Sequence, residues 1–457
     1  MKRDSLDLGK MNVPVLFRKY FVPTLLGMLS MASVTAIDGI YVGHGVGSDG
    51  IAAINICIPL LMLFTGFGLM LGIGSSVVAS IHLSHDKVKA ARINATQALW
   101  FVSIITSIAV ATIMIWPYET AMLLGSSEHL SSLVVTYLLW FGPSILFQMW
   151  LSVSLFIIRL DGSPQYAMWC NVVAALLTVI LGWIFIFPLQ LGIEGAALAA
   201  TVATAVGGIM GVFYIVFKAK KLRIIAIKIS LKSLMLSMRN IGYQCKIGSS
   251  ALLGEATLAT LMFVGNQVFM KYLGDNGVGA FGIACYYTPF VFMVGNAIAQ
   301  SAQPILSYNY GMNLRKRVSQ AEKLALKTAL MCGIAVTVVF YFFPHWLVGL
   351  FLPLDNPAAK IAVAGLPLFS LGFICFIVNL TAIGYYQSLE RIGAATSFAL
   401  LRGLLILVPA FYLLPMALGN NGIWLAMPTS EILTSLLIFI YYLLTKTMSK
   451  PNFKSKI

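Results

Sequence analysis

The sequence predicts an all-α polytopic membrane protein in which twelve transmembrane helices form two pseudo-symmetric six-helix lobes. Composition is the first observation behind this prediction: of 457 residues, 59% are hydrophobic and only 10% are charged. A soluble domain carries about 25% charged residues. So much apolar surface cannot be hidden in a water-soluble fold, and that class is excluded. The other two observations are the number of apolar segments and a repeat between the two halves of the chain.

Apolar segments of spanning length follow one another along the whole chain. A helix that crosses a bilayer needs about 20 predominantly apolar residues. Twelve segments meet this requirement, at residues 20–43, 50–80, 94–116, 131–156, 167–188, 192–217, 241–271, 277–308, 320–343, 359–386, 393–416 and 420–445. Several are longer than a bilayer requires, which indicates tilt or extension beyond the hydrocarbon layer.

The basic residues indicate how these helices are oriented. Of the 30 Lys and Arg residues, 26 lie in the termini and in every second loop. Cytoplasmic loops carry such an excess. We therefore expect both termini in the cytoplasm and a multi-pass chain in the bacterial plasma (inner) membrane. The formal charge of +15 then matches anionic lipid head groups and does not indicate a nucleic-acid partner.

A constant shift of 227 residues relates the two halves of the chain. It takes GSDGIAA (Gly47–Ala53) to GDNGVGA (Gly274–Ala280). It also takes Trp116-Pro117 to Phe343-Pro344, Pro188 to Pro415, and Gly195–Ala199 to Gly422–Ala426. Because each half has six predicted spans, both halves have the same orientation, and a pseudo-two-fold axis along the membrane normal should relate them.

The repeat divides the chain into four predicted parts. We expect an N-lobe at residues 1–216, a basic amphipathic linker on the cytoplasmic surface at 217–240, a C-lobe at 241–446 and a cytoplasmic tail at 447–457. Two packed six-helix lobes are typical of a transporter.

The sequence carries no motif of an enzyme. We find no Walker A pattern, no HExxH and no cluster of metal ligands, so we expect no catalytic activity, no bound metal and no cofactor other than a coupling ion. GFGLMLGIG (Gly66–Gly74) superficially resembles a nucleotide-binding loop, but it lies inside an apolar span, where close helix packing is the better interpretation. Without an ATP-binding domain, transport must use an ion gradient unless a separate subunit supplies energy.

Four segments resemble the multidrug and toxic compound extrusion (MATE) family, and its MepA-like bacterial group in particular. They are IDGIYVGHGVGSDGIAAINICIPL (Ile37–Leu60), RLDGSPQYAM (Arg159–Met168), AQSAQPILSYNYG (Ala299–Gly311) and GIWLAMPTSEIL (Gly422–Leu433). The resemblance covers nearly the whole chain. It implies a V-shaped twelve-helix exporter that uses an inward H⁺ or Na⁺ gradient to drive out amphipathic, often cationic compounds.

The resemblance also implies an ion-coupling residue on the first span. Asp38 matches the acidic residue that many MATE proteins carry there to bind the coupling ion. The MepA-like group often has Asn-x-x-x-Asp on the fifth span, where this chain has Thr178 and Gly182. Only Asp38, Asn55 and Thr178 are then available as ligands, which favours a proton over Na⁺ because Na⁺ prefers several oxygen ligands.

A second candidate for ion coupling lies on the seventh span. Glu255 aligns with the cation-site glutamate of the NorM-like branch of the family, and the aspartate of that branch on the tenth span is Asn379 here. One acidic member of the pair is therefore retained and the other is neutral.

Arg402 and Glu431 are two further charges near the middle of predicted spans. A charge at this depth costs about 2.5–3.5 kcal/mol on insertion scales, so buried charges pair or face a wet cavity. We expect Arg402 to lie close to Glu255, to Glu431 or to both, in a C-lobe charge cluster with Asn379. A structural Arg402–Glu431 pair and a coupling role for Glu255 both remain open.

Other polar side chains are candidate substrate or gate residues. Gln300, Gln303 and Tyr308 cluster around the end of the eighth span, in a segment that resembles a family motif near the cytoplasmic end. They are expected to stabilise an inner gate or the helix end. Gln148 and Trp150 on the fourth span are candidates for substrate contact.

The predicted function is cation-coupled multidrug efflux by alternating access, with H⁺ favoured over Na⁺ as the coupling ion, small molecules as substrates and a monomer in the lipid bilayer. Two alternatives remain open. One is a flippase for lipid-linked oligosaccharides or lipids in the same superfamily, whose cleft should carry several cations for pyrophosphate. The other is an exporter dedicated to one metabolite.

Overall fold

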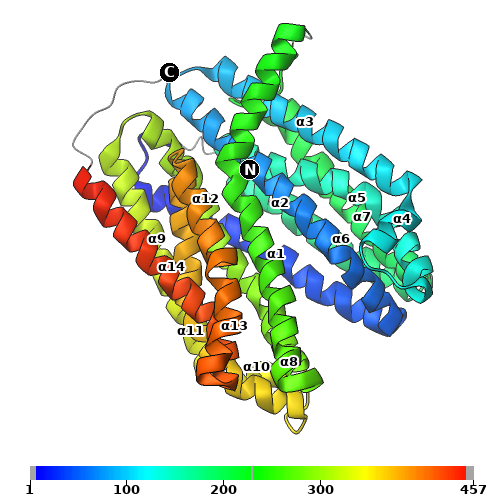
Figure 1. Cartoon of the computed structure of the whole chain (residues 1–457). Helices are drawn as coiled ribbons and strands as arrows, with labels where there is room; N and C mark the ends of the chain where they lie inside the picture. The colour runs from blue at the N-terminus through cyan, green and yellow to red at the C-terminus, as the bar shows by residue number, and fades with distance from the viewer. Residues whose placement is uncertain (1–6, 228–229, 449–457) are drawn as a thin grey trace. The chain divides into compact units, whose positions relative to one another are not determined.

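The computed structural model describes residues 7–227 and 230–448, and every regular element in these ranges is a helix (Figure 1). The first half of the chain forms α1 (Val13–Gly45), α2 (Ser48–Ser84), α3 (Val88–Ile115), α4 (Pro117–Leu123), α5 (Glu128–Leu160), α6 (Pro164–Ile186), α7 (Gly192–Phe213) and the π-helical turn η1 (Tyr214–Lys218). The second half forms α8 (Leu231–Gly311), α9 (Arg315–Phe342), α10 (Pro344–Gly349), α11 (Pro357–Ser388), α12 (Ile392–Leu400), η2 (Leu401–Leu405), α13 (Leu407–Leu418) and α14 (Asn420–Met448).

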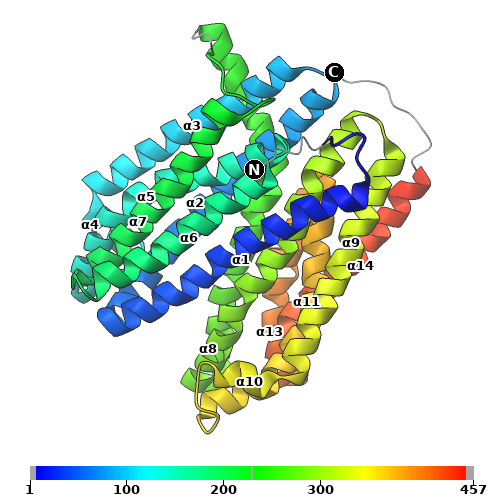
Figure 2. The same cartoon turned by 180° about the vertical axis from the view of Figure 1, so that it is seen from behind.

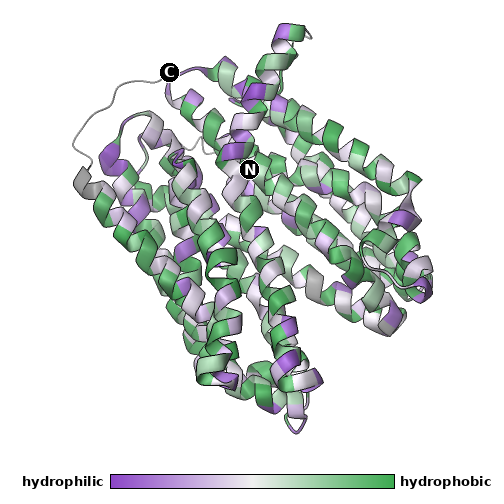
Figure 3. Ribbon diagram, viewed as in Figure 1, coloured by the Kyte–Doolittle hydropathy of each residue, from purple (hydrophilic) through white to green (hydrophobic). Residues whose placement is uncertain are grey.

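Eleven helices in the described ranges are long and apolar enough to cross a membrane. One of them, α8, has 81 residues and contains two of the predicted spans, 241–271 and 277–308. The two spans meet at Gly274, whose φ of 61° is readily adopted only by glycine. The twelve predicted spans therefore match the structure. Figure 3 shows hydrophobic residues along the length of these helices.

The 227-residue repeat is visible in the backbone. Gly47, which precedes α2, has a φ of 94°, and its equivalent Gly274 also has a positive φ. Gly192 and Gly419 form a second equivalent pair, with φ values of 57° and 58°. The repeat therefore extends from sequence to chain geometry.

Two short helices that the sequence did not predict also follow the repeat. α4 begins at Pro117 and α10 begins at Pro344. Proline is well suited to the first position of a helix because its missing N–H would have no partner there. The Trp-Pro and Phe-Pro dipeptides thus end one helix and start the next.

By contacts, the chain divides into two compact units. Unit 1 comprises Met1–Ala259, Ala297–Ala325 and Gly384–Gly393, and in it α5 packs on α2, α3 and α7 while α1 packs on α6 (Figures 1 and 2). Unit 2 comprises Thr260–Asn296, Leu326–Ile383 and Ala394–Ile457, and in it α14 packs on α13 and η2. Its core is aromatic, and Phe269 and Phe281 both contact Trp424. The lobe boundaries stay a prediction, and residues 449–457 of the predicted tail lie outside the described residues.

Candidate functional site

Two glycines let α2 and α8 approach each other backbone to backbone in unit 1. A Cβ atom at Gly74 of α2 would overlap the carbonyl oxygen of Gln244 in α8, and one at Gly248 of α8 would overlap the carbonyl oxygen of Met70 in α2. Small residues permit such close helix contacts in membranes. Gly72 of α2 makes room for the side chain of Phe156 in α5, whose ring a Cβ atom at Gly72 would overlap. The prediction that Gly66–Gly74 serves helix packing is confirmed.

The last turns of α8 meet α2 through residues that the repeat makes equivalent. Ser76 Oγ donates to Gln303 Oε1 at 3.2 Å, and these residues are 227 positions apart. Gly311 lies against Ser84 with no room for a side chain, and this pair has the same separation. Equivalent residues of a two-fold repeat can touch only close to its axis. We call these four residues the repeat junction.

A buried arginine lies beside the repeat junction. Arg159, at the end of α5, is only 3% exposed, although the sequence places it next to a loop. It donates from Nη1 to Gln300 Oε1 at 2.7 Å, and its Cζ lies 5.3 Å from the centre of the Phe156 ring. Its Nε has no acceptor among the described residues. Tyr20 of α1 donates to its carbonyl oxygen at 2.9 Å, so α1, α5 and α8 meet here.

The end of α8 is also held by the segment that precedes α1. Arg317 of α9 donates to Asn309 Oδ1 at 2.8 Å and to the carbonyl oxygen of Met11 at 2.7 Å. Asn309 Nδ2 donates to the carbonyl oxygen of Leu8 at 3.0 Å. Gln300, Gln303 and the half-buried Tyr308 belong to this polar end of α8. Their assignment as gate or helix-end residues stays a prediction.

Asp161 organises the chain that follows α7. Its Oδ1 accepts from the backbone N–H groups of Lys221 and Leu222 at 2.7 and 3.0 Å. Its Oδ2 accepts from the Lys220 N–H at 3.0 Å and from the Tyr214 hydroxyl at 2.9 Å. One carboxylate thus fixes the start of the linker between the two repeats, a role that the sequence did not reveal.

Replacing Asp161 should therefore weaken the fold at this turn. Asp161→Ala leaves three backbone donors without their acceptor and removes one of the two partners of the Tyr214 hydroxyl, and hydrogen bonds to charged groups contribute about 1.5–3 kcal/mol each. Because the turn is partly open to water, we expect a loss of about 2 kcal/mol in the free energy of unfolding. Asp161→Asn keeps one acceptor oxygen and should lose less. Thermal unfolding in detergent measures both, and equal stability of Asp161→Ala and wild type would contradict the assignment.

Asp38 lies in α1 and is half-buried in unit 1. Among the described residues, no hydrogen bond or ion pair to its carboxylate is formed. Asp38 acts electrostatically on the hydroxyl of Tyr137 in α5, which belongs to an apolar cluster with Cys57 of α2. The carboxylate is therefore placed among helices without a fixed polar partner.

The other residues predicted to join Asp38 have different surroundings. Asn55 is exposed, and the Thr178 hydroxyl donates to the Ala174 carbonyl of its own helix at 2.9 Å. A Cβ at Gly182 would lie 3.3 Å from the Tyr41 ring, so the missing side chain on α6 makes room for α1. The roles of Asn55 and Thr178 as ion ligands stay predictions.

Glu255 lies in α8 and belongs to unit 1, where its Cβ approaches Gly66 of α2. It is half-buried, and no hydrogen bond to its carboxylate is formed among the described residues of this unit. The described residues also contain no group of three or more His, Cys, Asp or Glu that could hold a metal ion. Its coupling role stays a prediction.

Arg402 and Glu431 form a buried ion pair in unit 2. Arg402, in η2, is 1% exposed and donates to Glu431 Oε1 from Nη2 at 2.6 Å and from Nε at 3.0 Å. Its Cζ lies 4.4 Å from the centre of the Phe376 ring. Asn379 Nδ2 donates to Glu431 Oε2 at 2.7 Å and receives a bond from Ser435 at its Oδ1. The expected contact of Arg402 with a mid-span glutamate is thus confirmed for Glu431.

The candidates on the fourth predicted span lie in α5. Trp150 donates from Nε1 to Ser103 Oγ of α3 at 2.7 Å, and its ring meets that of Phe147 edge to face. Gln148 is half-buried. Trp150 therefore joins α5 to α3, and a substrate contact for either residue stays a prediction.

A family model described as MatE matches the chain twice, at residues 23–184 and 251–413. The chain belongs to the MatE family. The two matches reproduce the repeat, because Gly47–Ala53 and Trp116-Pro117 fall in the first match and their equivalents, Gly274–Ala280 and Phe343-Pro344, fall in the second. The repeat junction, the buried Arg159 and the Arg402–Glu431 pair are accordingly features of a MatE protein.

Curated relatives and solved structures agree with this assignment. The multidrug export protein MepA of Staphylococcus saprophyticus is 24% identical over 442 residues, which cover 93% of this chain and 92% of that protein. MepA of Staphylococcus aureus is 22% identical over 437 residues with the same coverage. An outward-facing MATE family transporter of the MOP superfamily superposes with a TM-score of 0.89 at 19% identity, covering 97% of this chain and 98% of that one. The twelve-helix MATE fold is therefore shared.

Proposed function

We propose that this MatE protein is a multidrug exporter of the bacterial plasma membrane that works as a monomer with both termini in the cytoplasm. It exchanges amphipathic, often cationic compounds for inward-moving protons by alternating access. The similarity to proteins named multidrug export protein MepA, over 93% of the chain, supports the export of several compounds. The proposals of alternating access and of proton coupling are argued from residues of this chain.

The lack of a bonded partner for the Asp38 carboxylate is the observation that carries the proposal. Its carboxylate lies half-buried among helices, without a hydrogen bond or ion pair from any described residue. The carboxylate of Glu431, in contrast, is fixed by Arg402 and Asn379. Ionisable groups inside membrane proteins that lack a fixed partner mark ion pathways and proton relays. Asp38, which the family resemblance places at the coupling position, is therefore assigned the uptake and release of the proton, and Glu255, which also lacks a bonded partner among the described residues, is the alternative site.

Coupling requires that the proton and the substrate favour different conformations, because a ligand with equal affinity for both shifts nothing. Protonation removes the charge of Asp38 and allows α1 to repack. Its contact with α6 includes two glycines, because Gly45 lies against Ile186 and Gly182 lies against Tyr41. Pro23 adds a flexible point in the same helix.

The repeat junction is the candidate inner gate. It joins α2 to the last turns of α8 through small residues and one side-chain hydrogen bond, from Ser76 to Gln303. Neutral hydrogen bonds of this kind contribute only about 0.5–1.5 kcal/mol each. A contact that depends on shape more than on strong bonds can open and close during each transport cycle.

The Arg402–Glu431 pair favours export of cations or neutral compounds over pyrophosphate-bearing lipids. A flippase needs cations that are free to bind phosphate, whereas Arg402 is neutralised by Glu431 and covered by Phe376. The positive charge of Arg402 is therefore paired within unit 2 and is not free to bind phosphate.

Drug susceptibility in a pump-deficient bacterial host tests the proposal. Wild type should raise the inhibitory concentrations of several structurally unrelated lipophilic cations, and Gly248→Leu, present in the membrane at the same level, should not. Protection against a single compound would replace the proposal with a dedicated exporter. If the folded protein is present in the membrane and protects against none of the compounds, drug export is contradicted altogether.

A further inference from the structure

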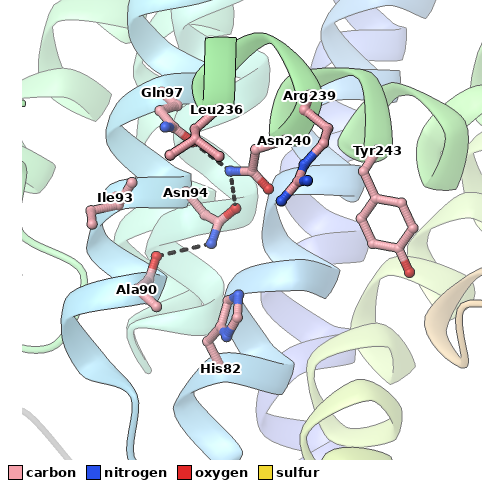
Figure 4. A pocket seen from close by; sticks show the side chains of 9 residues that line it. All are labelled: His82, Ala90, Ile93, Asn94, Gln97, Leu236, Arg239, Asn240 and Tyr243. Carbon is pink, nitrogen blue, oxygen red and sulfur yellow. Dashed lines mark hydrogen bonds between the residues drawn. The ribbon is translucent and has the colours of Figure 1, made fainter. Parts of the chain in front are cut away.

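A pocket of about 580 Å³ opens between α2, α3 and the first turns of α8, within unit 1 (Figure 4). Its walls come from the flanks of two basic loops, at residues 82–92 and 216–240. The lining residues are His82, Ala90, Ile93, Asn94, Gln97, Leu236, Arg239, Asn240 and Tyr243. The pocket thus lies on the face of the molecule where positive charge gathers.

A network of amides fixes one wall of this pocket. Asn240 Nδ2 donates to Asn94 Oδ1 at 2.5 Å and also to Gln97 Oε1. Gln244 Nε2 donates to the same Asn94 oxygen at 3.1 Å, and Gln97 Nε2 donates to Ser237 Oγ at 2.8 Å. Asn94 and Gln97 are buried, so the wall is preformed.

Arg239, the cation among the lining residues, does not take part in this network. Figure 4 shows the Arg239 guanidinium beside Asn240, with His82 on the opposite side. No hydrogen bond from Arg239 is formed among the described residues. None of the lining residues is acidic, and Glu390 reaches the wall only through a hydrogen bond with Tyr243. Burial raises the pKa of Glu390.

An apolar stripe runs from the pocket along α3. Trp100, Ile104 and Ile108 follow Gln97 at helical spacing and are 61%, 53% and 59% exposed. The first turns of α8 carry further exposed apolar side chains, among them Leu234 and Met238. A basic, polar pocket that continues into an exposed apolar stripe matches an amphiphile with an anionic head.

We propose that this pocket binds the phosphate of an anionic phospholipid of the surrounding leaflet, with an acyl chain along the α3 stripe. Arg239 binds the phosphate, since guanidinium groups form strong charge-assisted bonds to phosphate oxygens. The lipid holds the linker between the two repeats against α2 and α3. This site goes beyond drug export and does not depend on which compound or ion is transported.

Quenching of tryptophan fluorescence by a lipid with brominated acyl chains tests the site on the purified full-length protein. Trp100 reports occupancy, and the Trp100→Phe variant supplies the signal of the remaining tryptophans. Brominated phosphatidylglycerol should quench Trp100 at lower lipid fractions than brominated phosphatidylcholine. Arg239→Gln should raise the half-saturating fraction of phosphatidylglycerol about fivefold, the effect of one basic residue near a lipid surface. Lys232→Gln, an exposed cation of the same helix outside the pocket, should leave it unchanged.

Each other outcome overturns the proposal. Equal quenching by the two lipids would show that lipids surround the protein without preference for an anionic head group. Equal effects of Arg239→Gln and Lys232→Gln would show general attraction to the basic face. Loss of phosphatidylglycerol quenching on adding glycerol 3-phosphate, at lipid levels that saturate wild type, would assign the pocket to a soluble phosphate ester. Quenching requires no transport, so the result is independent of the proposed export.

Discussion

Glu431→Gln should lower the free energy of unfolding by about 3–5 kcal/mol, the penalty for leaving one member of a buried ion pair without its partner. Arg402 is 1% exposed and has two nitrogen atoms bonded to Glu431. The neutral amide keeps the shape of the carboxylate and the bond with Asn379 can re-form, but the guanidinium charge stays buried without compensation. Thermal unfolding of the purified protein in one detergent measures the loss.

The matched double variant, Arg402→Met with Glu431→Met, should recover most of this loss, because apolar residues of similar volume often replace a buried pair without penalty. Ser435→Ala, which leaves the ion pair intact and removes the bond to Asn379 Oδ1, should cost about 1 kcal/mol. A single variant as stable as wild type, or a double variant as unstable as the single one, would contradict the structural role of the pair.

Gly248→Leu should reduce efflux to below about a tenth of the wild-type rate, because even its Cβ would overlap the Met70 carbonyl oxygen. Backbone atoms of α2 cannot rotate away as a side chain can, so α2 and α8 must separate. In the proposed mechanism this separation also displaces α2 from the repeat junction, the candidate inner gate, which α2 forms with the last turns of α8. Efflux from proteoliposomes, normalised to the amount of folded protein, measures the effect.

Gly242→Leu is the matched control, since Gly242 lies on the same helix and a Cβ there would meet no atom within 4 Å. It should transport at the wild-type rate. Gly74→Leu places a side chain on the α2 side of the same contact between α2 and α8, and it should reproduce the defect of Gly248→Leu. Normal efflux by both crossing variants would exclude a gating role for this contact.

The membrane fold was predictable because hydropathy and the repeat are properties of the sequence itself. The twelve spans match, and the shift of 227 residues correctly paired Gly47 with Gly274 before their positive φ values were known. The short helices α4 and α10 were not predicted because six or seven residues carry too little periodicity to separate a helix from a loop.

The candidate site was predictable only where a charge interrupts an apolar span. Asp38, Glu255, Arg402 and Glu431 stand out because a charge in the bilayer is expensive. Arg159 and Asp161 do not stand out, because they lie beside a basic loop where charges are common, and only tertiary packing buries Arg159. Gly74 was read correctly as a packing residue, but its partner in α8 depends on which helices meet, which hydropathy does not encode.

Proton coupling through Asp38 is the central claim, and Asp38→Asn changes only its ability to ionise. The most direct measurement is efflux of one lipophilic cation from proteoliposomes with an imposed pH gradient and, separately, an imposed Na⁺ gradient, for wild type, Asp38→Asn and Glu255→Gln. We expect that the pH gradient alone drives wild-type efflux and that Asp38→Asn abolishes it. Unchanged pH-driven efflux in Asp38→Asn, together with its loss in Glu255→Gln, would contradict the account and move the coupling site to α8.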